Sequence, residues 1–119
     1  MKMKTHKDLV AWQRSISFVT EIYKVTKDFP DDEIFGLVSQ LRRASTSIPL
    51  NIAEGAARDS KKDFNRFLHI SLGSASEIET QIIICENLNY LKSEQSRELQ
   101  IKLAGIRRTL IGLISSLKE

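Results

Sequence analysis

The sequence predicts an all-α protein, folded as an antiparallel up-down four-helix bundle. In four long segments, apolar residues recur at spacings of three and four, which is the period of one helix face. No run alternates apolar and polar residues as a strand does, and two prolines and five glycines are too few for long irregular regions. The connections between the segments are short, which favours antiparallel neighbours.

The composition is that of one domain with a single core and a charged surface. The chain has 119 residues, of which 41% are hydrophobic and 28% are charged. We therefore expect residues 1–119 to form one four-helix bundle domain. The basic start of the chain does not lead into an uninterrupted apolar stretch, and no run approaches the roughly 18 apolar residues of a membrane span. A cytoplasmic protein without membrane contact is expected.

The first two helices are expected over residues 8–27 and 32–56. The apolar stripe of the first consists of Leu9, Trp12, Ile16, Val19 and Tyr23. The stripe of the second consists of Ile34, Leu37, Leu41, Ser45, Ile48 and Ile52. Pro49 lies inside the second helix, where it removes a backbone donor, so we expect a kink near Pro49. The alternative is two shorter helices that break there.

The last two helices are expected over residues 61–89 and 94–117. Ser60 is placed to cap the third helix, whose stripe consists of Phe64, Phe67, Ser71, Ala75, Ile78, Ile82 and Cys85. The stripe of the fourth consists of Leu99, Leu103, Ile106, Leu110, Leu113 and Leu117. The single cysteine lies on an apolar line, which indicates a buried and unreactive thiol.

Two helices carry more apolar surface than one bundle face requires. Ala11, Phe18, Ile22 and Val25 widen the apolar arc of the first helix to roughly 200° at about 100° per residue. Ile70, Ile84 and Leu88 lie off the main stripe of the third helix. Surplus apolar surface of this kind favours a homo-oligomer. The alternative is that the bundle buries both helices deeply.

Two sets of polar residues are candidates for binding or assembly. Six cations between residues 42 and 66 outnumber three carboxylates, and they are candidate phosphate contacts: Arg42, Arg43, Arg58, Lys61, Lys62 and Arg66. A second set follows the second helix at steps of three or four, and we name it the polar ladder: Gln40, Arg43, Ser47, Asn51, Glu54 and Arg58. A solvated face is the alternative reading of both sets.

No catalytic or metal-binding pattern is present. Bundles that hold two metals use Glu-x-x-His motifs, but Arg66 stands three residues before His69, and Met3 three before His6. The chain has no glycine-rich phosphate loop and no nucleophile elbow. We therefore expect no enzyme activity, cofactor, metal or small-molecule substrate.

The run from Phe35 to Gly55 has a distinctive pattern of polar and small residues. It reads Phe35-Gly36-Leu37, Ser39-Gln40-Leu41-Arg42-Arg43-Ala44, Ser47-Ile48-Pro49 and Asn51-Ile52-Ala53-Glu54-Gly55. Matching features elsewhere are Asp8-Leu9, Trp12-Gln13, Phe64, Phe67-Leu68, Gly73-Ser74, Glu77 and Glu79. With these, nearly the whole chain resembles the four-helix bundle proteins encoded within bacterial 23S ribosomal RNA intervening sequences.

The resemblance implies a bundle that assembles as a homopentamer, without known catalytic residues. A related branch, the accessory proteins of diversity-generating retroelements, forms basic pentamers that engage nucleic acid and a reverse transcriptase. A net charge of only +3 favours the intervening-sequence branch for this chain. The first functional hypothesis is a non-enzymatic oligomer that associates with RNA or DNA. The alternatives are a structural or protein-binding scaffold and an accessory protein to a reverse transcriptase.

Overall fold

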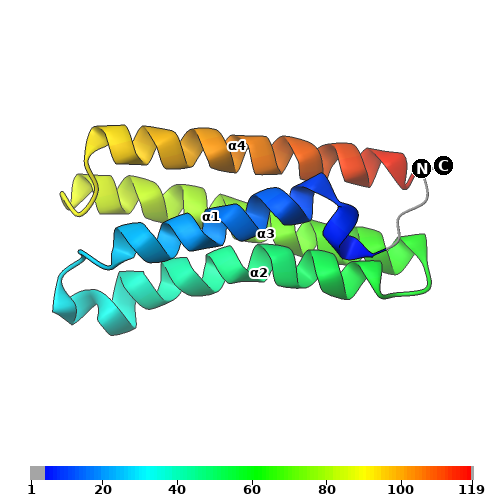
Figure 1. Ribbon diagram of the computed structural model, residues 1–119, viewed down its shortest axis with the longest axis horizontal. Coiled ribbons are helices and arrows are strands. Elements are labelled where there is room, and N and C mark those ends of the chain that lie inside the picture. Colours follow the sequence, from blue (N-terminus) through cyan, green and yellow to red (C-terminus); the bar gives the residue numbers. More distant parts are fainter. Residues whose placement is uncertain (1–4, 119) are drawn as a thin grey trace.

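Four long helices make up most of the protein, which measures 45 × 24 × 20 Å (Figure 1). The computed structural model describes residues 5–118. The helices are α1 (Val10–Thr26), α2 (Ser39–Ala56), α3 (Lys61–Asn87) and α4 (Ser93–Ser116). Short 3₁₀ turns cover His6–Asp8 and Asp31–Glu33, and a π-helical turn covers Ile34–Val38. No strand occurs in the described part of the chain, so the predicted all-α fold is confirmed.

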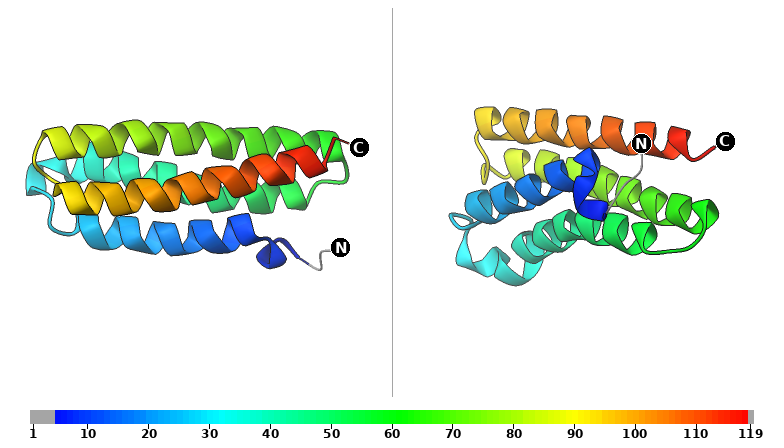
Figure 2. Two further views of the ribbon diagram at one scale, coloured as in Figure 1. Left: turned by 90° about the horizontal axis from the view of Figure 1, so that it is seen from above. Right: turned by 45° about the vertical axis from the view of Figure 1, so that its right-hand side comes forward.

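Consecutive helices run in opposite directions. In Figure 1, α1 and α3 run from right to left and α2 and α4 from left to right, so α1 begins and α4 ends at the end that holds the α2–α3 turn. The most extensive packing is between α2 and α3. The packing between the first and last helices, α1 and α4, is less extensive than that between any two consecutive long helices. Figure 2 shows from two further sides that the α1–α2 and α3–α4 turns lie at one end of the bundle and the α2–α3 turn at the other.

The buried face of α1 differs from the predicted stripe. Its buried residues are Ala11, Ser15, Phe18, Ile22 and Thr26, whereas Ile16 and Tyr23 are each 40% exposed. Leu9, Trp12 and Val25 pack only at the edge of the core. The wide apolar arc holds two overlapping stripes with the same period, and spacing alone does not show which of them faces the core. The stripe through Phe18 and Ile22 faces the core, so the prediction that the stripe through Ile16 and Tyr23 does so was wrong.

The start of the second helical segment is also irregular where a regular helix was predicted. After the turn at Asp31–Glu33, the backbone widens into the π-helical turn, and Gly36 has non-helical angles of φ −108° and ψ −113°. The Glu33 carboxylate holds this shape, because Oε1 accepts the Leu37 N–H at 3.1 Å and Oε2 accepts the Tyr90 hydroxyl at 3.0 Å. A Cβ at position 36 would lie 2.6 Å from that Oε1, so glycine leaves the carboxylate room. The hydrogen bond to Glu33 also raises the pKa of Tyr90.

Pro49 does not break the helix. The α2 helix is continuous from Ser39 to Ala56 with Pro49 buried inside it, so the alternative of two shorter helices was wrong. A departure from helical angles is found at Gly36, about three and a half turns before Pro49. The kink near Pro49 stays a prediction. Beside the proline, Ser71 of α3 donates its hydroxyl to the Ile48 carbonyl at 2.9 Å.

The remaining two helices follow their predicted stripes closely. In α3 every stripe residue from Phe67 to Cys85 is buried, and Phe64 is half-buried. The Ser60 hydroxyl accepts the Asp63 N–H at 3.1 Å, as predicted for the helix cap. In α4 the stripe is buried from Leu99 to Leu110 and only partly buried at Leu113 and Leu117.

A close approach of α2 and α3, which we call the α2–α3 seam, lies near the turn that joins them. A Cβ at Gly55 would lie 2.8 Å from the Phe67 Cβ and 2.9 Å from the Phe64 Cδ1. Two serines of α3 continue the seam, since Ser71 reaches the Ile48 carbonyl and Ser74 lies 2.9 Å from the Ser47 hydroxyl. Gly55 is therefore the residue that lets the two helices meet at this distance.

We expect Gly55→Ala to lower the free energy of unfolding by about 1–3 kcal/mol, because the added methyl group overpacks the seam. The matched control is Gly73→Ala in the exposed face of α3, where a Cβ would meet nothing within 4 Å. That control should raise stability by up to about 1 kcal/mol through helix propensity. Urea denaturation followed by circular dichroism measures both changes. Equal stability gains in the two variants would contradict the close approach.

Cys85 is fully buried in the core, as predicted. Burial away from water, and secondarily the negative charge of Glu33, raise the pKa of its thiol from 9.0 to about 11. The folded pKa lies above the unfolded one, so ionisation of this thiol leaves stability unchanged below pH 9.0 and reduces it as pH rises through about 11.

We expect native Cys85 to react with a thiol-specific disulfide reagent at least roughly a hundredfold more slowly than the unfolded chain at about pH 8, because the thiolate is scarce and shielded. Absorbance of the released thiolate measures the rate in buffer and in concentrated guanidinium chloride. A native rate equal to the unfolded rate would mean that the thiol is accessible.

Candidate functional site

The six cations predicted to contact phosphates separate into two groups. Arg42 and Arg43 lie in the first half of α2, whereas Arg58, Lys61, Lys62 and Arg66 flank the α2–α3 turn, and we call these four the turn cluster. The sixteen positions from Arg42 to Arg58 correspond to about 24 Å along a helix. The structure therefore brings four of the six cations together and leaves the other pair apart.

Arg42 ties α2 to α1. Its Nε donates to the Thr26 hydroxyl at 3.0 Å, and its guanidinium carbon lies 4.4 Å from the centre of the Tyr23 ring. The Thr26 hydroxyl in turn donates to the Ile22 carbonyl at 2.7 Å. Arg42 is half-buried by these contacts, while its neighbour Arg43 is exposed. Adjacent arginines on one helix thus have different roles, because they point about 100° apart.

In the turn cluster, two arginines share one aromatic ring. The guanidinium carbons of Arg58 and Arg66 lie 5.1 and 4.4 Å from the centre of the Phe67 ring, within the range of a cation–π contact. Phe67 itself is fixed by the seam, since its Cβ faces Gly55. The ring therefore holds two positive charges in defined places at the surface, beside the exposed Lys61 and Lys62.

Carboxylates accompany the turn cluster. Arg58 donates to Glu54 at 2.8 Å, but both side chains are about half exposed, so this ion pair contributes little to stability. Asp59 is exposed in the turn and Asp63 is half-buried in the first turn of α3. With three carboxylates near four cations, the surface is only mildly basic.

The polar ladder is partly closed onto α3. Its ends, Gln40, Arg43, Glu54 and Arg58, are exposed, whereas Ser47 and Asn51 in the middle are half-buried. Asn51 Nδ2 donates to the Ser47 carbonyl at 2.8 Å and to its hydroxyl at 2.9 Å, and the same hydroxyl meets Ser74. The middle of the ladder therefore belongs to the α2–α3 seam, and its ends stay accessible to another molecule.

Several large apolar side chains are not covered by the chain's own bundle. The three residues predicted as surplus on the third helix, Ile70, Ile84 and Leu88, are 41%, 41% and 48% exposed. Phe35, on the π-helical turn, is 97% exposed. The alternative that the bundle buries this surplus surface of the third helix was wrong.

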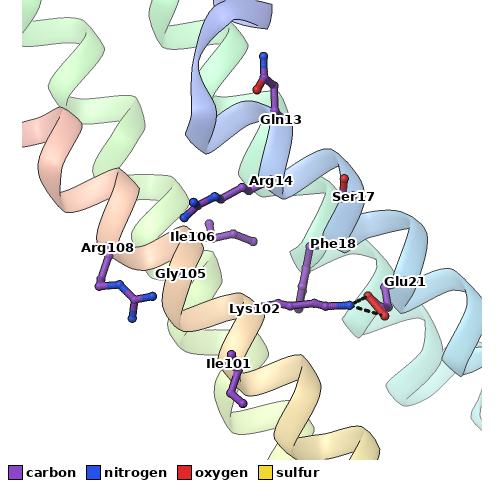
Figure 3. A pocket seen from close by; sticks show the side chains of 10 residues that line it. All are labelled: Gln13, Arg14, Ser17, Phe18, Glu21, Ile101, Lys102, Gly105, Ile106 and Arg108. Atoms are coloured by element: carbon purple, nitrogen blue, oxygen red, sulfur yellow. Dashed lines mark hydrogen bonds and ion pairs between the residues drawn. The ribbon is translucent and has the colours of Figure 1, made fainter.

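A groove between α1 and α4, which we call the α1–α4 groove, was not found from the sequence (Figure 3). Its volume is about 500 Å³, and it runs beside Gly105 of α4. Arg14 of α1 and Arg108 of α4 flank that glycine, and one turn away Lys102 forms an ion pair with Glu21, with its Nζ 2.8 Å from Oε2. No local signal predicts the groove, because the two arginines lie far apart in the chain, near its two ends.

Other chemistries find no support in residues 5–118. No group of three or more His, Cys, Asp and Glu side chains in this range could hold a metal ion. His69 is exposed on α3. None of the described helices has the length and apolar character to cross a membrane.

Comparison with known proteins identifies the family. No curated protein matches the chain. A solved structure from Bacteroides thetaiotaomicron VPI-5482, described as a protein of unknown function from the S23 ribosomal protein family, is 29% identical to it, with a TM-score of 0.84. The alignment covers 92% of this chain and 98% of that one. A family model matches over residues 7–112, and the chain belongs to the family of 23S rRNA-intervening sequence proteins.

Proposed function

We propose that this protein is a non-enzymatic, cytoplasmic homo-oligomer that associates with RNA or DNA through the turn cluster. The observation that carries the proposal is the placement of Arg58 and Arg66 on the Phe67 ring, with Lys61 and Lys62 exposed beside them. Guanidinium and ammonium groups contact phosphate oxygens without reading base sequence. Membership of the 23S rRNA-intervening sequence family agrees with a role near nucleic acid.

Assembly is the second part of the proposal. A single copy offers four cations next to three carboxylates, which is a weak electrostatic site. Several copies in one closed assembly would present the same cluster repeatedly, and avidity would rise without any new contact type. The family resemblance favours five copies, and the exposed Phe35, Ile70, Ile84 and Leu88 provide apolar surface for the contacts between them.

A scaffold that binds only protein is the competing function. The hydrogen bonds that Ser47 and Asn51 make within the chain favour it, because they give the polar ladder a role in the fold that requires no nucleic acid. The two functions differ in whether the turn cluster contributes to binding of phosphates, and this can be measured directly.

We expect the wild-type protein to retain structured RNA and duplex DNA at low salt, with little sequence preference and with affinity that falls steeply as salt increases. The triple variant Arg58→Gln, Lys61→Gln and Lys62→Gln should bind all sequences more weakly. On duplex DNA, the slope of its log affinity against log salt should flatten by about 0.9 for each phosphate that the variant no longer neutralises. Fluorescence anisotropy over a salt series measures both quantities.

The control for this experiment removes the same charge elsewhere, with Lys24→Gln, Lys27→Gln and Arg97→Gln on the exposed surfaces of α1 and α4 and the turn after α1. Binding that falls equally in both triple variants would indicate net charge alone. If the wild-type protein retains neither RNA nor DNA at about 50 mM salt, the scaffold function replaces the nucleic-acid function.

We expect light scattering after size exclusion to give a mass well above that of one chain, with five copies favoured. Phe35→Ser should lower the mass and leave the helical circular dichroism unchanged, because a side chain that is 97% exposed contributes almost nothing to the core. Gly73→Ala is a neutral control on an open helix face. A monomeric mass for the wild-type protein at high concentration would end the oligomer proposal, and a stable dimer would exclude the pentamer.

A further inference from the structure

Two arginines in the α1–α4 groove point at one place. If Gly105 carried a Cβ, that atom would lie 3.6 Å from Nη1 of Arg14 and 3.7 Å from Nη2 of Arg108. The two side chains come from different helices and reach this point from opposite sides, as Figure 3 shows. Two guanidinium groups that converge in this way repel each other unless an anion lies between them.

Neither guanidinium has a partner within the described chain. The side chains of Arg14 and Arg108 make no hydrogen bond, ion pair or ring contact with any residue in the range 5–118, whereas those of Arg42, Arg58, Arg66 and Arg107 each make at least one. The one carboxylate that lines the groove, Glu21, is already engaged by Lys102 through both of its oxygens. The positive charge beside Gly105 is therefore uncompensated.

The glycine leaves space for a ligand between them. Gly105 lies in the interior of α4, where glycine is less favourable than alanine, and its backbone has no positive φ that would require it. It is also buried beneath the groove, and a Cβ there would meet only the ends of the two arginine side chains. The missing side chain therefore opens room at the point on which the two charges converge.

We propose that the α1–α4 groove is a phosphate-binding site, in which Arg14 and Arg108 hold the phosphate above Gly105. A tetrahedral oxyanion can accept charge-assisted hydrogen bonds of about 2.7–2.9 Å from both guanidinium groups at once. Phe18, Ile101 and Ile106 add an apolar wall to the groove, which suits a phosphate ester as well as the free ion. The source of the phosphate group is either a small phosphorylated molecule or the backbone of a nucleic acid.

The test is a titration of the full-length protein with inorganic phosphate at constant ionic strength, followed by calorimetry, and a parallel titration with a labelled single-stranded oligouridine, followed by anisotropy. Arg14→Gln and Arg108→Gln should each weaken binding roughly tenfold or more. Arg97→Gln, which removes an exposed charge from the same α4 helix, is the matched control and should bind like the wild type.

Gly105→Ala tests the site without changing any charge. It should weaken phosphate binding because the methyl group occupies the ligand's place, while the thermal midpoint stays the same or rises. Binding of phosphate that depends on both arginines supports a small-molecule source, and binding of the oligonucleotide alone with the same dependence supports a nucleic-acid source. The proposal is overturned if the wild type binds neither probe, or if the arginine variants lose no more affinity than Arg97→Gln. These residues lie outside the turn cluster, so failure here leaves the proposed function intact.

Discussion

The distance between α2 and α3 at Gly55 determines much of the molecule. No Cβ fits between Gly55 and Phe67, so the two helices approach here to within backbone-to-side-chain contact. The hydroxyls of Ser71 and Ser74 then meet acceptors on α2 further along the seam. Because the seam fixes Phe67, it also fixes the two arginines that lie against the Phe67 ring. The two arginines of the turn cluster are therefore positioned by packing inside the bundle.

α1 and α4 pack less extensively than α2 and α3 do, and individual side chains hold parts of the chain to this pair. α1 is held to α2 by Arg42, through Thr26 and the Tyr23 ring, and the start of the second helical segment is held to the α3–α4 turn by Glu33 and Tyr90. Both ties lie toward the end of the bundle where α1 finishes. α1 and α4 pack against each other less extensively than the other neighbouring helices do. The α1–α4 groove lies between these two helices.

The accuracy of the sequence predictions depended on how local the deciding interactions are. The stripes of α3 and α4 could be predicted because each helix has one dominant apolar line. The face of α1 could not, because two lines with the same period compete and only packing selects between them. The irregular start of the second segment depends on a hydrogen bond between residues 57 positions apart, Tyr90 and Glu33, which no local pattern contains.

The candidate sites, too, could be predicted only where the residues that form them are close in the sequence. Cations that are close in the chain could be predicted to gather at the α2–α3 turn. The engagement of Arg42 by α1 could not be predicted, since it depends on which way each side chain points. The two arginines of the groove are close only because the first and last helices are neighbours in the fold.

The two basic sites differ in how their charges are paired. The turn cluster is exposed and shares its charges with nearby carboxylates, and mobile ions screen it readily. Arg14 and Arg108 of the groove are exposed as well, so mobile ions screen them too, but no carboxylate within residues 5–118 forms an ion pair with either of them. A phosphate in the groove would therefore meet two unpaired guanidinium groups, whereas a phosphate at the turn would compete with Glu54 for Arg58. The pairing of the cations, as well as their number, determines how strongly each site holds a phosphate.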